Sequence, residues 1–274
     1  MKSYKEIISV VSADVQKLEE KLAQEIIYPT MELKNLILAP AKRIRPVLAF
    51  LFLRANGITP DNSQITLQSA VELVHTASLV HDDIIDESSV RRGLETLNSK
   101  YSDKLAVLSG DYLLSLALKK LTTLGNINIL QAFFETFEEM VQGEINQYFT
   151  KGQIPTLDDY IAKTVAKTAN LFKLALTTSA EISKTSISMA EDFGLNFGIA
   201  FQIKNDLEDY LGNNQDFKNG IFTLPMIFEK DLAIDKTKSL MNIYIKQAKN
   251  SIKDLPKNDY KKALEEILEC FIND

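Results

Sequence analysis

The long central part of the chain contains no proline, and this feature constrains the fold more than any other. All seven prolines lie at or before Pro60 or at or after Pro155, and there are only ten glycines among 274 residues. Proline and glycine interrupt helices, and the alternating apolar and polar runs that mark strands are scarce here. The sequence therefore predicts an all-helical protein.

The spacing of apolar residues supports this prediction. Near the N-terminus they recur every three or four residues, as in an amphipathic helix, at Ile8, Val11, Val15, Leu18 and Leu22. Further helices are predicted over residues 46–56, 63–87, 103–124, 128–149, 157–182 and 186–211. Thr156 followed by Asp159 predicts a capping box that opens the fifth of these. Several helices lack a wide polar face, so we expect one large single-domain bundle over residues 1–274, with buried central helices.

Composition excludes several classes of protein. The net charge is −6 without a basic stripe, which argues against a nucleic-acid-binding protein. Cys270 is the sole cysteine, so no intramolecular disulfide forms, and the N-terminus does not resemble a signal peptide. No window offers the roughly 20 apolar residues of a membrane-spanning helix. These features predict a cytoplasmic protein without a transmembrane segment.

The first acidic cluster ends an otherwise apolar helical stretch. Asp82 and Asp86 are one helical turn apart, and Asp83 and Asp86 are neighbours at i and i+3. Carboxylates crowded on one face of a buried helix are costly unless a cation lies beside them. Magnesium is the natural candidate because it prefers carboxylate oxygen and keeps water and phosphate in its shell. The alternative is a solvated helix end, or a cap cluster of the following helix.

A second acidic cluster ends the helix predicted over residues 186–211. Asp206 and Asp209 lie at i and i+3, and Asn205 shares a face with Asp209. Alone, such a cluster is most simply an exposed helix surface. Two clusters that each end an apolar helix are more informative, because facing helices of a bundle can hold magnesium ions between them.

Basic residues flank the first cluster along the chain. Arg91 and Arg92 follow it directly, and Lys42 and Arg45 lie in an earlier basic segment. The planar fork of arginine suits phosphate oxygens, and lysine supplies a point charge. The arginine pair is equally compatible with surface ion pairs to the neighbouring acids, which stabilise a fold only weakly.

Two further polar residues lie inside apolar helical stretches. His75 precedes Asp82 by about two helical turns and lies near the same helix face. A lone histidine in such a helix is more often a hydrogen-bonded core residue than a ligand. Lys167 can place its stem along apolar surface and its ammonium in water, or it can point toward a phosphate.

Together these residues resemble the trans-prenyl diphosphate synthases, the family that includes farnesyl and longer polyprenyl diphosphate synthases. Matching segments occur in the family's order and cover most of the chain between residues 40 and 226. They are residues 42–46, 72–86, 91–93, 110–113, 143–144, 167–172, 201–209 and 223–225. The resemblance implies a helical bundle of the isoprenoid synthase type with a central cavity, and a homodimer.

The resemblance also implies a role for each matching residue. Magnesium, up to three ions, would be bound by Asp82, Asp83, Asp86, Asn205, Asp206 and Asp209. The allylic diphosphate would contact Arg91 and Lys167. Isopentenyl diphosphate would be held by Lys42, Arg45, His75 and Arg92. The reacting centre would be lined by Thr168 and Gln202.

The implied activity is magnesium-dependent head-to-tail condensation of isopentenyl diphosphate with an allylic prenyl diphosphate. Magnesium, Arg91 and Lys167 would neutralise the departing diphosphate, and such electrostatic stabilisation is usually the largest catalytic effect. The oxygen dipoles of Thr168 and Gln202 would stabilise the allylic cation, and the released diphosphate would accept the proton. The lipid product, a longer trans-polyprenyl diphosphate, would be handed to a membrane.

Product length is expected to depend on the depth of the pocket. In the family, an aromatic residue five positions before the first aspartate blocks the pocket of short-chain enzymes. Here Ala77 and Ser78 are small, so we predict a product longer than farnesyl diphosphate. A deeper floor would be formed by Phe133, Phe134 or Phe137, which are equally compatible with ordinary core positions.

Several departures from the family pattern leave two other functions open. Asn205 stands for an aspartate, Ile221 for a diphosphate-contacting lysine, Pro40-Ala41 for a glycine pair, and the C-terminal part is shortened. Asn205, Ile221 and the shortened C-terminal part favour a non-catalytic regulatory subunit of a heteromeric synthase, whereas the intact first acidic motif and the arginine pair that follows it argue against one. A class I terpene cyclase shares the fold and an Asn-Asp second motif, but it has no need for residues that hold isopentenyl diphosphate.

Overall fold

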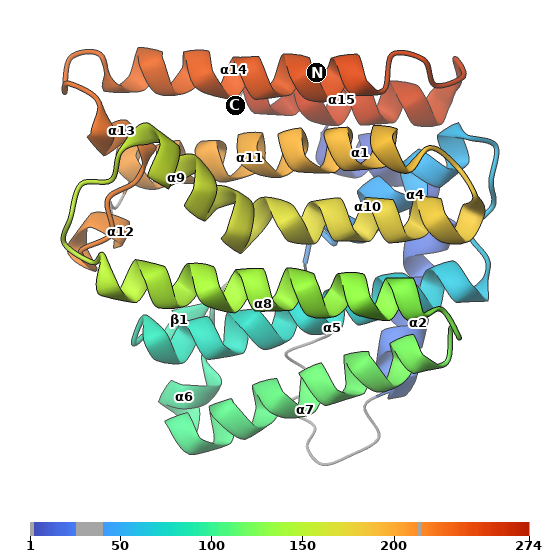
Figure 1. Ribbon diagram of the computed structural model, residues 1–274, viewed down its shortest axis with the longest axis horizontal. Helices are drawn as coiled ribbons and strands as arrows, with labels where there is room; N and C mark the ends of the chain where they lie inside the picture. Colours follow the sequence, from blue (N-terminus) through green and yellow to red (C-terminus); the bar gives the residue numbers. More distant parts are fainter. Residues whose placement is uncertain (1–2, 26–40, 92, 213–214, 274) are drawn as a thin grey trace. The chain divides into compact units, whose positions relative to one another are not determined.

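The structure, a computed structural model, describes residues 3–25, 41–91, 93–212 and 215–273 (Figure 1). Within these residues the only strands are β1 (Val90–Arg91) and β2 (Leu94–Glu95), an antiparallel pair. The all-helical prediction is confirmed. The α-helices are α1 (Tyr4–Ile8), α2 (Ser12–Glu25), α4 (Ile44–Ala55), α5 (Asn62–Ile85), α6 (Leu97–Lys100), α7 (Asp103–Thr122), α8 (Ile127–Phe149), α9 (Leu157–Thr164), α10 (Asn170–Ser183), α11 (Ile187–Leu211), α12 (Gln215–Lys218), α13 (Leu224–Ile227), α14 (Ala233–Ser251) and α15 (Asp259–Asn273). A 3-10 turn, η1 (Ser9–Val11), and a π-helical segment, η2 (Val165–Ala169), complete the helical structure of these residues.

Five of the predicted internal helices begin and end within two residues of their predicted bounds. In the structure they are α4, α5, α7, α8 and α11. The helix predicted over residues 157–182 is instead divided into α9, η2 and α10. No glycine or proline marks the interruption in the sequence, which is why the pattern did not predict it. The predicted capping box at its start is confirmed, because Thr156 and Asp159 exchange both side-chain to backbone hydrogen bonds.

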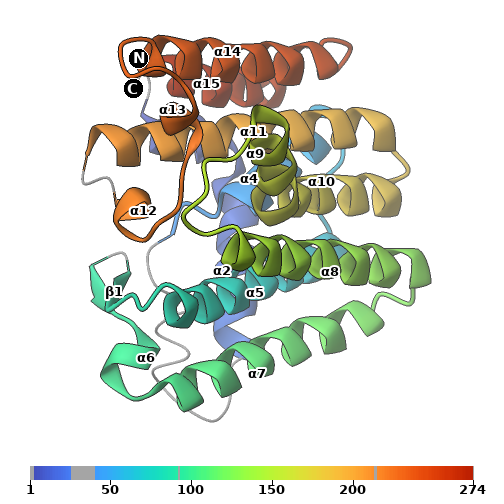
Figure 2. The same cartoon turned by 60° about the vertical axis from the view of Figure 1, so that its left-hand side comes forward.

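The chain forms two compact units. The larger unit comprises Met1–Val10, Leu51–Ile58 and Gln131–Asp274, and the smaller unit comprises Val11–Phe50 and Thr59–Leu130. Figure 2 shows the same elements from a second direction. The expectation of a single domain over residues 1–274 stays a prediction.

In the larger unit, α11 lies between α10 and α14 and contacts both (Figures 1 and 2). Phe172 of α10 packs against Phe197 and Phe201 of α11, with ring centroids 5.3 Å apart in each pair. Gly198 lets the helices approach closely, since a Cβ atom there would lie 2.5 Å from the Cα atom of Ala169. This close approach fixes η2, which carries Lys167 and Thr168, against the middle of α11.

In the smaller unit, α5 packs along α7 and also contacts α2 (Figures 1 and 2). Its start is fixed by Asp61, whose side chain accepts a hydrogen bond from the backbone N–H of Gln64 at 3.0 Å. Most side chains of α5 from Gln64 to Val80 are buried. The helix is therefore a core element whose C-terminal turn carries the first acidic cluster.

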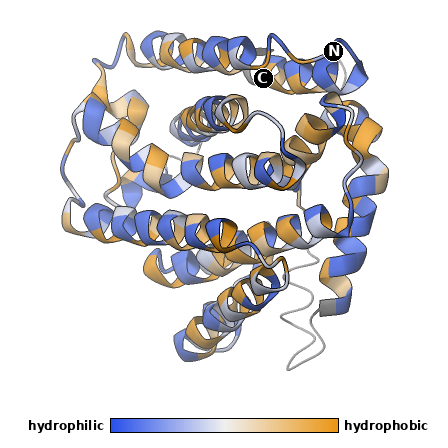
Figure 3. Cartoon of the chain, turned by 45° about the vertical axis from the view of Figure 1, so that its right-hand side comes forward, coloured by the Kyte–Doolittle hydropathy of each residue, from blue (hydrophilic) through white to orange (hydrophobic). Residues whose placement is uncertain are grey.

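Every helix in the described part of the chain is too short or too polar to cross a bilayer. Figure 3 shows hydrophilic and hydrophobic residues interspersed along the long helices. This pattern is typical of helices that pack on one face and meet water on another.

Candidate functional site

The first acidic cluster lies at the C-terminal end of α5, in the smaller unit. Asp83 is 4% exposed, and its Oδ1 atom lies 2.5 Å from Nε of Arg91 in β1. Asp86 is the C-cap of α5, and its N–H donates to the carbonyl of Asp82 at 2.8 Å. The short hairpin after α5 therefore returns an arginine to the cluster. Arg92, the second predicted arginine, lies outside the described residues.

Burial raises the pKa of the Asp83 carboxyl above its usual value. The hydrogen bond and charge of Arg91 oppose this rise, while the nearby charge of Asp86 adds to it. A desolvated carboxylate beside a second carboxylate favours a cation at this place. Asp83 is therefore not solvated, as it would be if the cluster were simply a solvated helix end, one of the two alternative interpretations.

The segment of residues 110–113 supports the cluster from α7. A Cβ atom at Gly110 would lie 2.2 Å from Nε2 of His81, so a larger residue there would require the imidazole ring to shift. The same Nε2 atom lies 3.5 Å from Oδ1 of Asp111 and 3.3 Å from the carbonyl of Val107. The residue before the first aspartate is thus packed directly against α7.

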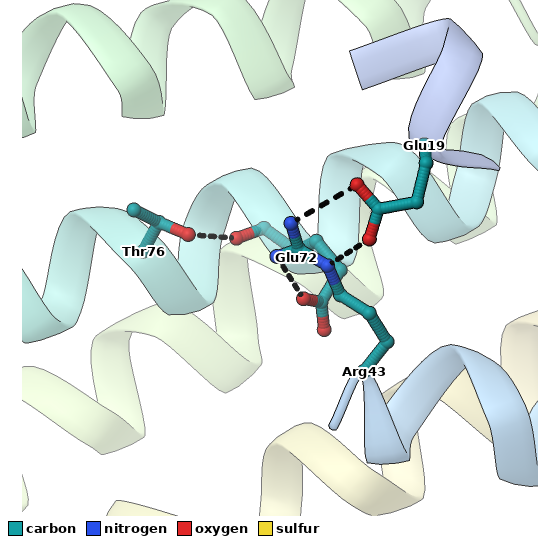
Figure 4. Close-up of polar contacts among 4 residues, drawn as sticks. All are labelled: Glu19, Arg43, Glu72 and Thr76. Atoms are coloured by element: carbon teal, nitrogen blue, oxygen red, sulfur yellow. Dashed lines mark hydrogen bonds and ion pairs between the residues drawn. The ribbon is translucent and has the colours of Figure 1, made fainter. Parts of the chain in front are cut away.

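The predicted isopentenyl diphosphate residues also lie in the smaller unit. Lys42 is exposed just before α4, Arg45 is buried in the first turn of α4, and His75 is half-buried in α5. Between the first two, Arg43 forms ion pairs with Glu19 and Glu72 (Figure 4). The smaller unit thus contains every described residue that was predicted to hold this substrate.

The second acidic cluster lies in the larger unit and belongs to a chain of hydrogen bonds. The hydroxyl of Thr168 donates to Oε1 of Gln202 at 2.9 Å, and Nε2 of Gln202 donates to Oδ1 of Asp206 at 2.7 Å. The hydroxyl of Tyr160 donates to Oδ2 of Asp206 at 2.6 Å. Three residues predicted separately from the sequence are therefore joined in one network, with Tyr160 at its end.

Both ends of the Tyr160 contact are buried, since Tyr160 is 1% and Asp206 is 3% exposed. Burial raises the pKa of Asp206, and its hydrogen bonds from Tyr160 and Gln202 lower it. Burial and the charge of Asp206 likewise raise the pKa of Tyr160 well above its usual value. Tyr160 therefore keeps its proton at neutral pH and donates a hydrogen bond to the carboxylate.

Other predicted residues of the larger unit have partners of their own. Lys167 forms an ion pair with Glu144 of α8. Asp209 accepts hydrogen bonds from the backbone N–H groups of Gln215 and Asp216, at 2.9 and 3.1 Å, at the start of α12. Asn205, in contrast, is exposed on α11. The cluster thus presents one buried carboxylate, one carboxylate held by backbone amides and one exposed amide.

A cavity of about 760 Å³ lies in the larger unit. Its wall includes residues of α8 and α9, the connection between them, and Gly220, Ile221 and Phe222. Lys163 also lines it, and burial lowers the pKa of this lysine while the charge of Asp206 opposes the change. Ile221, which departs from the family pattern, is therefore an apolar part of a cavity wall.

The residues predicted to control product length differ in exposure. Ala77 is 1% exposed in α5, and the hydroxyl of Ser78 donates to the carbonyl of His75 at 2.9 Å. On α8, Phe133 is buried, Phe137 is half-buried and Phe134 is 51% exposed. Their assignment to the pocket stays a prediction.

The residues of both clusters fit magnesium by their chemistry. Among the described residues, no three His, Cys, Asp or Glu side chains gather closely enough to form a complete protein cage for a metal. Magnesium does not require one, because it is commonly bound by one or two carboxylates together with water and substrate phosphate. Asp83 and Asp206 each supply a buried carboxylate of that kind.

Sequence reasoning did not find Tyr160, Arg43 or Glu144 as parts of the site. Tyr160 lies about two helical turns before Lys167, but nothing in the pattern distinguishes it from a core tyrosine. Glu144 was noticed within a matching segment without a role. The structure shows why the preceding residue, Gly143, is a glycine. A Cβ atom at this position would lie 3.0 Å from the Cβ atom of Ala166.

Comparison with known proteins agrees with this arrangement. A sequence profile described as Polyprenyl synthetase matches residues 29–263, which include both acidic clusters and all the basic residues discussed above. The chain belongs to the polyprenyl synthetase family. The resemblance noted from the sequence motifs is confirmed.

Individual members of the polyprenyl synthetase family show the extent of the similarity. The decaprenyl-diphosphate synthase of Dictyostelium discoideum is 38% identical over 198 residues, which cover 68% of this chain and 43% of that protein. The octaprenyl diphosphate synthase of Escherichia coli is 35% identical over 198 residues, covering 68% and 61%. The chain thus spans less than two thirds of the length of these two relatives.

The fold is that of solved polyprenyl synthases. The crystal structure of a polyprenyl synthase from Caulobacter crescentus, complexed with calcium and isoprenyl diphosphate, has a TM-score of 0.91 and 25% identity, and covers 99% of this chain and 98% of that chain. The prediction of an isoprenoid synthase fold is therefore confirmed.

Proposed function

We propose that this member of the polyprenyl synthetase family condenses isopentenyl diphosphate head to tail with an allylic prenyl diphosphate. The products would be a longer trans-polyprenyl diphosphate and free diphosphate. One observation carries the proposal. Each acidic motif contains a buried carboxylate, Asp83 or Asp206, whose pKa is raised by burial. A carboxylate in such a place is costly unless a cation is bound beside it.

Magnesium, when bound by Asp82, Asp83 and Asp86 and by Asn205, Asp206 and Asp209, would supply the positive charge that makes diphosphate a good leaving group. Calcium and isoprenyl diphosphate in the Caulobacter relative support a divalent cation and a diphosphate as ligands here. Arg91 and Lys167 would bind the diphosphate of the allylic substrate through charge-assisted hydrogen bonds.

The other residues of the proposed site act on the second substrate and on the allylic carbon. Lys42, Arg45, His75 and Arg92 would hold isopentenyl diphosphate, so that only the allylic diphosphate ionises. The carbon–oxygen bond of the allylic substrate breaks, the double bond of isopentenyl diphosphate forms the new carbon–carbon bond, and the departing diphosphate takes up the proton. Thr168 and Gln202, already joined by a hydrogen bond, would place oxygen dipoles near the cation.

Elongation by the lone chain tests the proposal. Purified protein, magnesium, farnesyl diphosphate and labelled isopentenyl diphosphate are expected to give labelled products longer than farnesyl diphosphate on chromatography. Absence of elongation would favour the regulatory subunit, to which Ile221 and Asn205 also point. Cyclic hydrocarbon formed from an allylic diphosphate alone would identify a cyclase.

An exposed apolar stripe on α8 of the larger unit supports the proposed homodimer. Phe134, Val141, Ile145 and Tyr148 are each more than 40% exposed and recur along α8 at helical spacing. Such an apolar stripe is typical of a surface that a second protein covers. Light scattering on the same preparation is expected to give the mass of two chains, and the mass of one chain would contradict the homodimer.

Ala77→Phe is expected to shorten the main product by at least one isoprene unit. Ala77 is 1% exposed, so a phenyl ring there must displace whatever occupies the adjoining space. Product chromatography measures the distribution, and Ala77→Ser is the control because it keeps the residue small. An unchanged distribution in the phenylalanine variant, together with retained folding, would show that Ala77 does not border the product.

Tyr160→Phe is expected to raise the magnesium concentration for half-maximal activity about 10- to 100-fold, the usual effect of removing a group that orients a metal ligand. The variant loses the hydroxyl that donates to Oδ2 of Asp206. Because this hydrogen bond lowers the pKa of Asp206, its loss also favours the protonated carboxyl, which binds metal poorly. Tyr101→Phe, at an exposed position just after α6, is the control, and equal magnesium curves for the two variants would contradict the role of Tyr160.

A further inference from the structure

Arg43 lies between two predicted diphosphate-binding residues, yet its own side chain is turned into the protein. It is 5% exposed, and its Nε atom lies 2.7 Å from Oε1 of Glu19 on α2. One terminal nitrogen lies 3.3 Å from Oε2 of Glu19, and the other lies 2.9 Å from Oε2 of Glu72 on α5. Figure 4 shows the guanidinium group held between the two carboxylates. We call these three residues the Arg43 cluster.

The cluster combines strong hydrogen bonds with burial. The two contacts to Glu19 use the fork of the guanidinium group, which is the geometry that makes arginine–carboxylate pairs directional. Glu72 is 3% exposed, so its charge is compensated within the protein. Burial alone would lower the pKa of Arg43, but the two glutamates raise it above its usual value, so the group stays charged.

The backbone of Arg43 is also unusual. Its φ angle is +47°, in the left-handed region that residues with a Cβ atom rarely adopt. Its carbonyl accepts a hydrogen bond from the N–H of Val47 at 3.0 Å, so this strained residue is the one from which α4 begins. Since the conformation is costly by itself, the ion pairs of the side chain must help to hold it.

The position of the cluster connects it to the second substrate. Lys42 precedes Arg43 directly, and Arg45 follows it by two residues in the first turn of α4. Glu72 precedes His75 by about one turn of α5, and the hydroxyl of Thr76 donates to the Glu72 carbonyl at 2.8 Å (Figure 4). All three described residues predicted to hold isopentenyl diphosphate therefore lie within three positions of a member of the cluster.

We infer that Arg43 is a positioning residue for isopentenyl diphosphate, an inference that rests on the proposed function. By turning inward and locking the left-handed backbone at the start of α4, it leaves Lys42 exposed and fixes the place of Arg45 in the first turn of that helix. By binding Glu72 it holds this segment against the helix that carries His75. Arg43 does not contact the substrate itself. It fixes the relative places of the groups that do.

The test must separate positioning from folding, because Arg43→Ala would leave Glu72 buried without its partner and would destabilise the fold. Arg43→Lys keeps the charge and removes the planar fork. Arg43→Gln combined with Glu72→Gln removes both buried charges together. Arg54→Lys, near the other end of α4, is the matched control for the conservative change.

Steady-state elongation with each substrate varied in turn gives the decisive comparison. In Arg43→Lys and in the double variant, the groups that hold isopentenyl diphosphate are displaced. The KM for this substrate is therefore expected to rise about tenfold or more, which is the effect of losing one charge-assisted hydrogen bond between the protein and the substrate. The KM for the allylic diphosphate is expected to stay within about twofold of wild type, as both values should in Arg54→Lys. A lowered melting temperature with an unchanged KM for isopentenyl diphosphate would show a merely structural role and overturn the inference.

Amide hydrogen exchange provides a readout that does not need activity. Residues 41–47 are expected to exchange faster in Arg43→Lys than in wild type or Arg54→Lys, and equal exchange would overturn the inference. If wild-type protein fails to elongate, the proposed function fails, and the exchange experiment still decides whether Arg43 holds this segment. If wild type elongates and the variants keep its KM values, the inference alone fails.

Discussion

Asp206→Asn is expected to lower the kcat of elongation about 100- to 1,000-fold, the usual size of the loss when one preorganised electrostatic group is removed. The variant keeps nearly the same shape but loses the charge that the proposed magnesium site requires. Elongation measured at saturating substrates and magnesium gives the comparison. Asp192→Asn is the matched control, because Asp192 is exposed on the same helix, α11.

The fold of the Asp206→Asn variant is expected to survive, because its hydrogen bonds can be rearranged. The asparagine oxygen can still accept from Tyr160, and its amide group can donate to Gln202 after the Gln202 amide turns over. The turned amide then donates to the hydroxyl of Thr168, which can accept. Tyr160, Gln202 and Thr168 thus keep their hydrogen bonds without a negative charge, and the asparagine oxygen is left as the acceptor for the backbone N–H of Leu224, which also donates to Asp206.

The stability of the same variant gives an independent check through pH. Burial raises the pKa of Asp206, so folding favours its protonated form. The contribution of the protonated Asp206 carboxyl to stability is therefore present below the unfolded-state pKa. This contribution is lost as the pH rises through the folded-state pKa. Metal-free Asp206→Asn should thus be at least as stable as wild type at pH 7. A clear fall in melting temperature, or kcat equal to that of Asp192→Asn, would contradict the role given to Asp206.

Gly198→Val is expected to destabilise the fold by about 1–3 kcal/mol, the usual cost of inserting methyl groups into a packed core. A Cβ atom at position 198 would lie 2.5 Å from the Cα and 2.8 Å from the Cβ atom of Ala169. The first of these is a backbone atom, so relief requires α11 and η2 to move apart. Because η2 carries Lys167 and Thr168, activity is expected to fall as well.

Helix propensity makes this prediction sharper. Valine is a better helix former than glycine, so on an open helix surface the change would be neutral or slightly stabilising. Asp192→Val, at an exposed position of the same helix, is the control for a β-branched residue. Thermal and denaturant unfolding measure the stability of both variants. A Gly198→Val protein as stable as the control would show that the close contact between position 198 and Ala169 does not determine the stability of the fold.

The parts of the fold that the sequence predicted are those determined by local patterns. The helix that became α5 follows from an uninterrupted apolar stretch, and α9 begins where Thr156 and Asp159 form a capping box. The π-helical segment η2 was not predicted, because Val165–Ala169 contains no residue that interrupts a helix. Its position depends on close packing against Gly198, which is distant in the sequence.

The same distinction applies to the candidate site. Aspartates at i, i+3 and i+4 can be recognised from spacing, and Asp83 and Asp206 are indeed the buried members of their clusters. Their partners could not be recognised. Tyr160 reaches Asp206 across 46 positions of sequence, and the inward direction of Arg43 depends on a left-handed backbone that its residue type does not suggest. Such contacts are decided by tertiary packing.

Counting the divalent ions bound together with inorganic pyrophosphate tests whether both acidic motifs hold metal. Manganese, titrated into the protein with pyrophosphate and followed by electron paramagnetic resonance, is expected to bind to wild type at more than one site per chain. Asp83→Asn and Asp206→Asn should each bind fewer ions than Asp192→Asn, since both acidic motifs would hold metal. Binding of manganese that is unchanged in either variant would contradict the claim that both motifs are metal ligands.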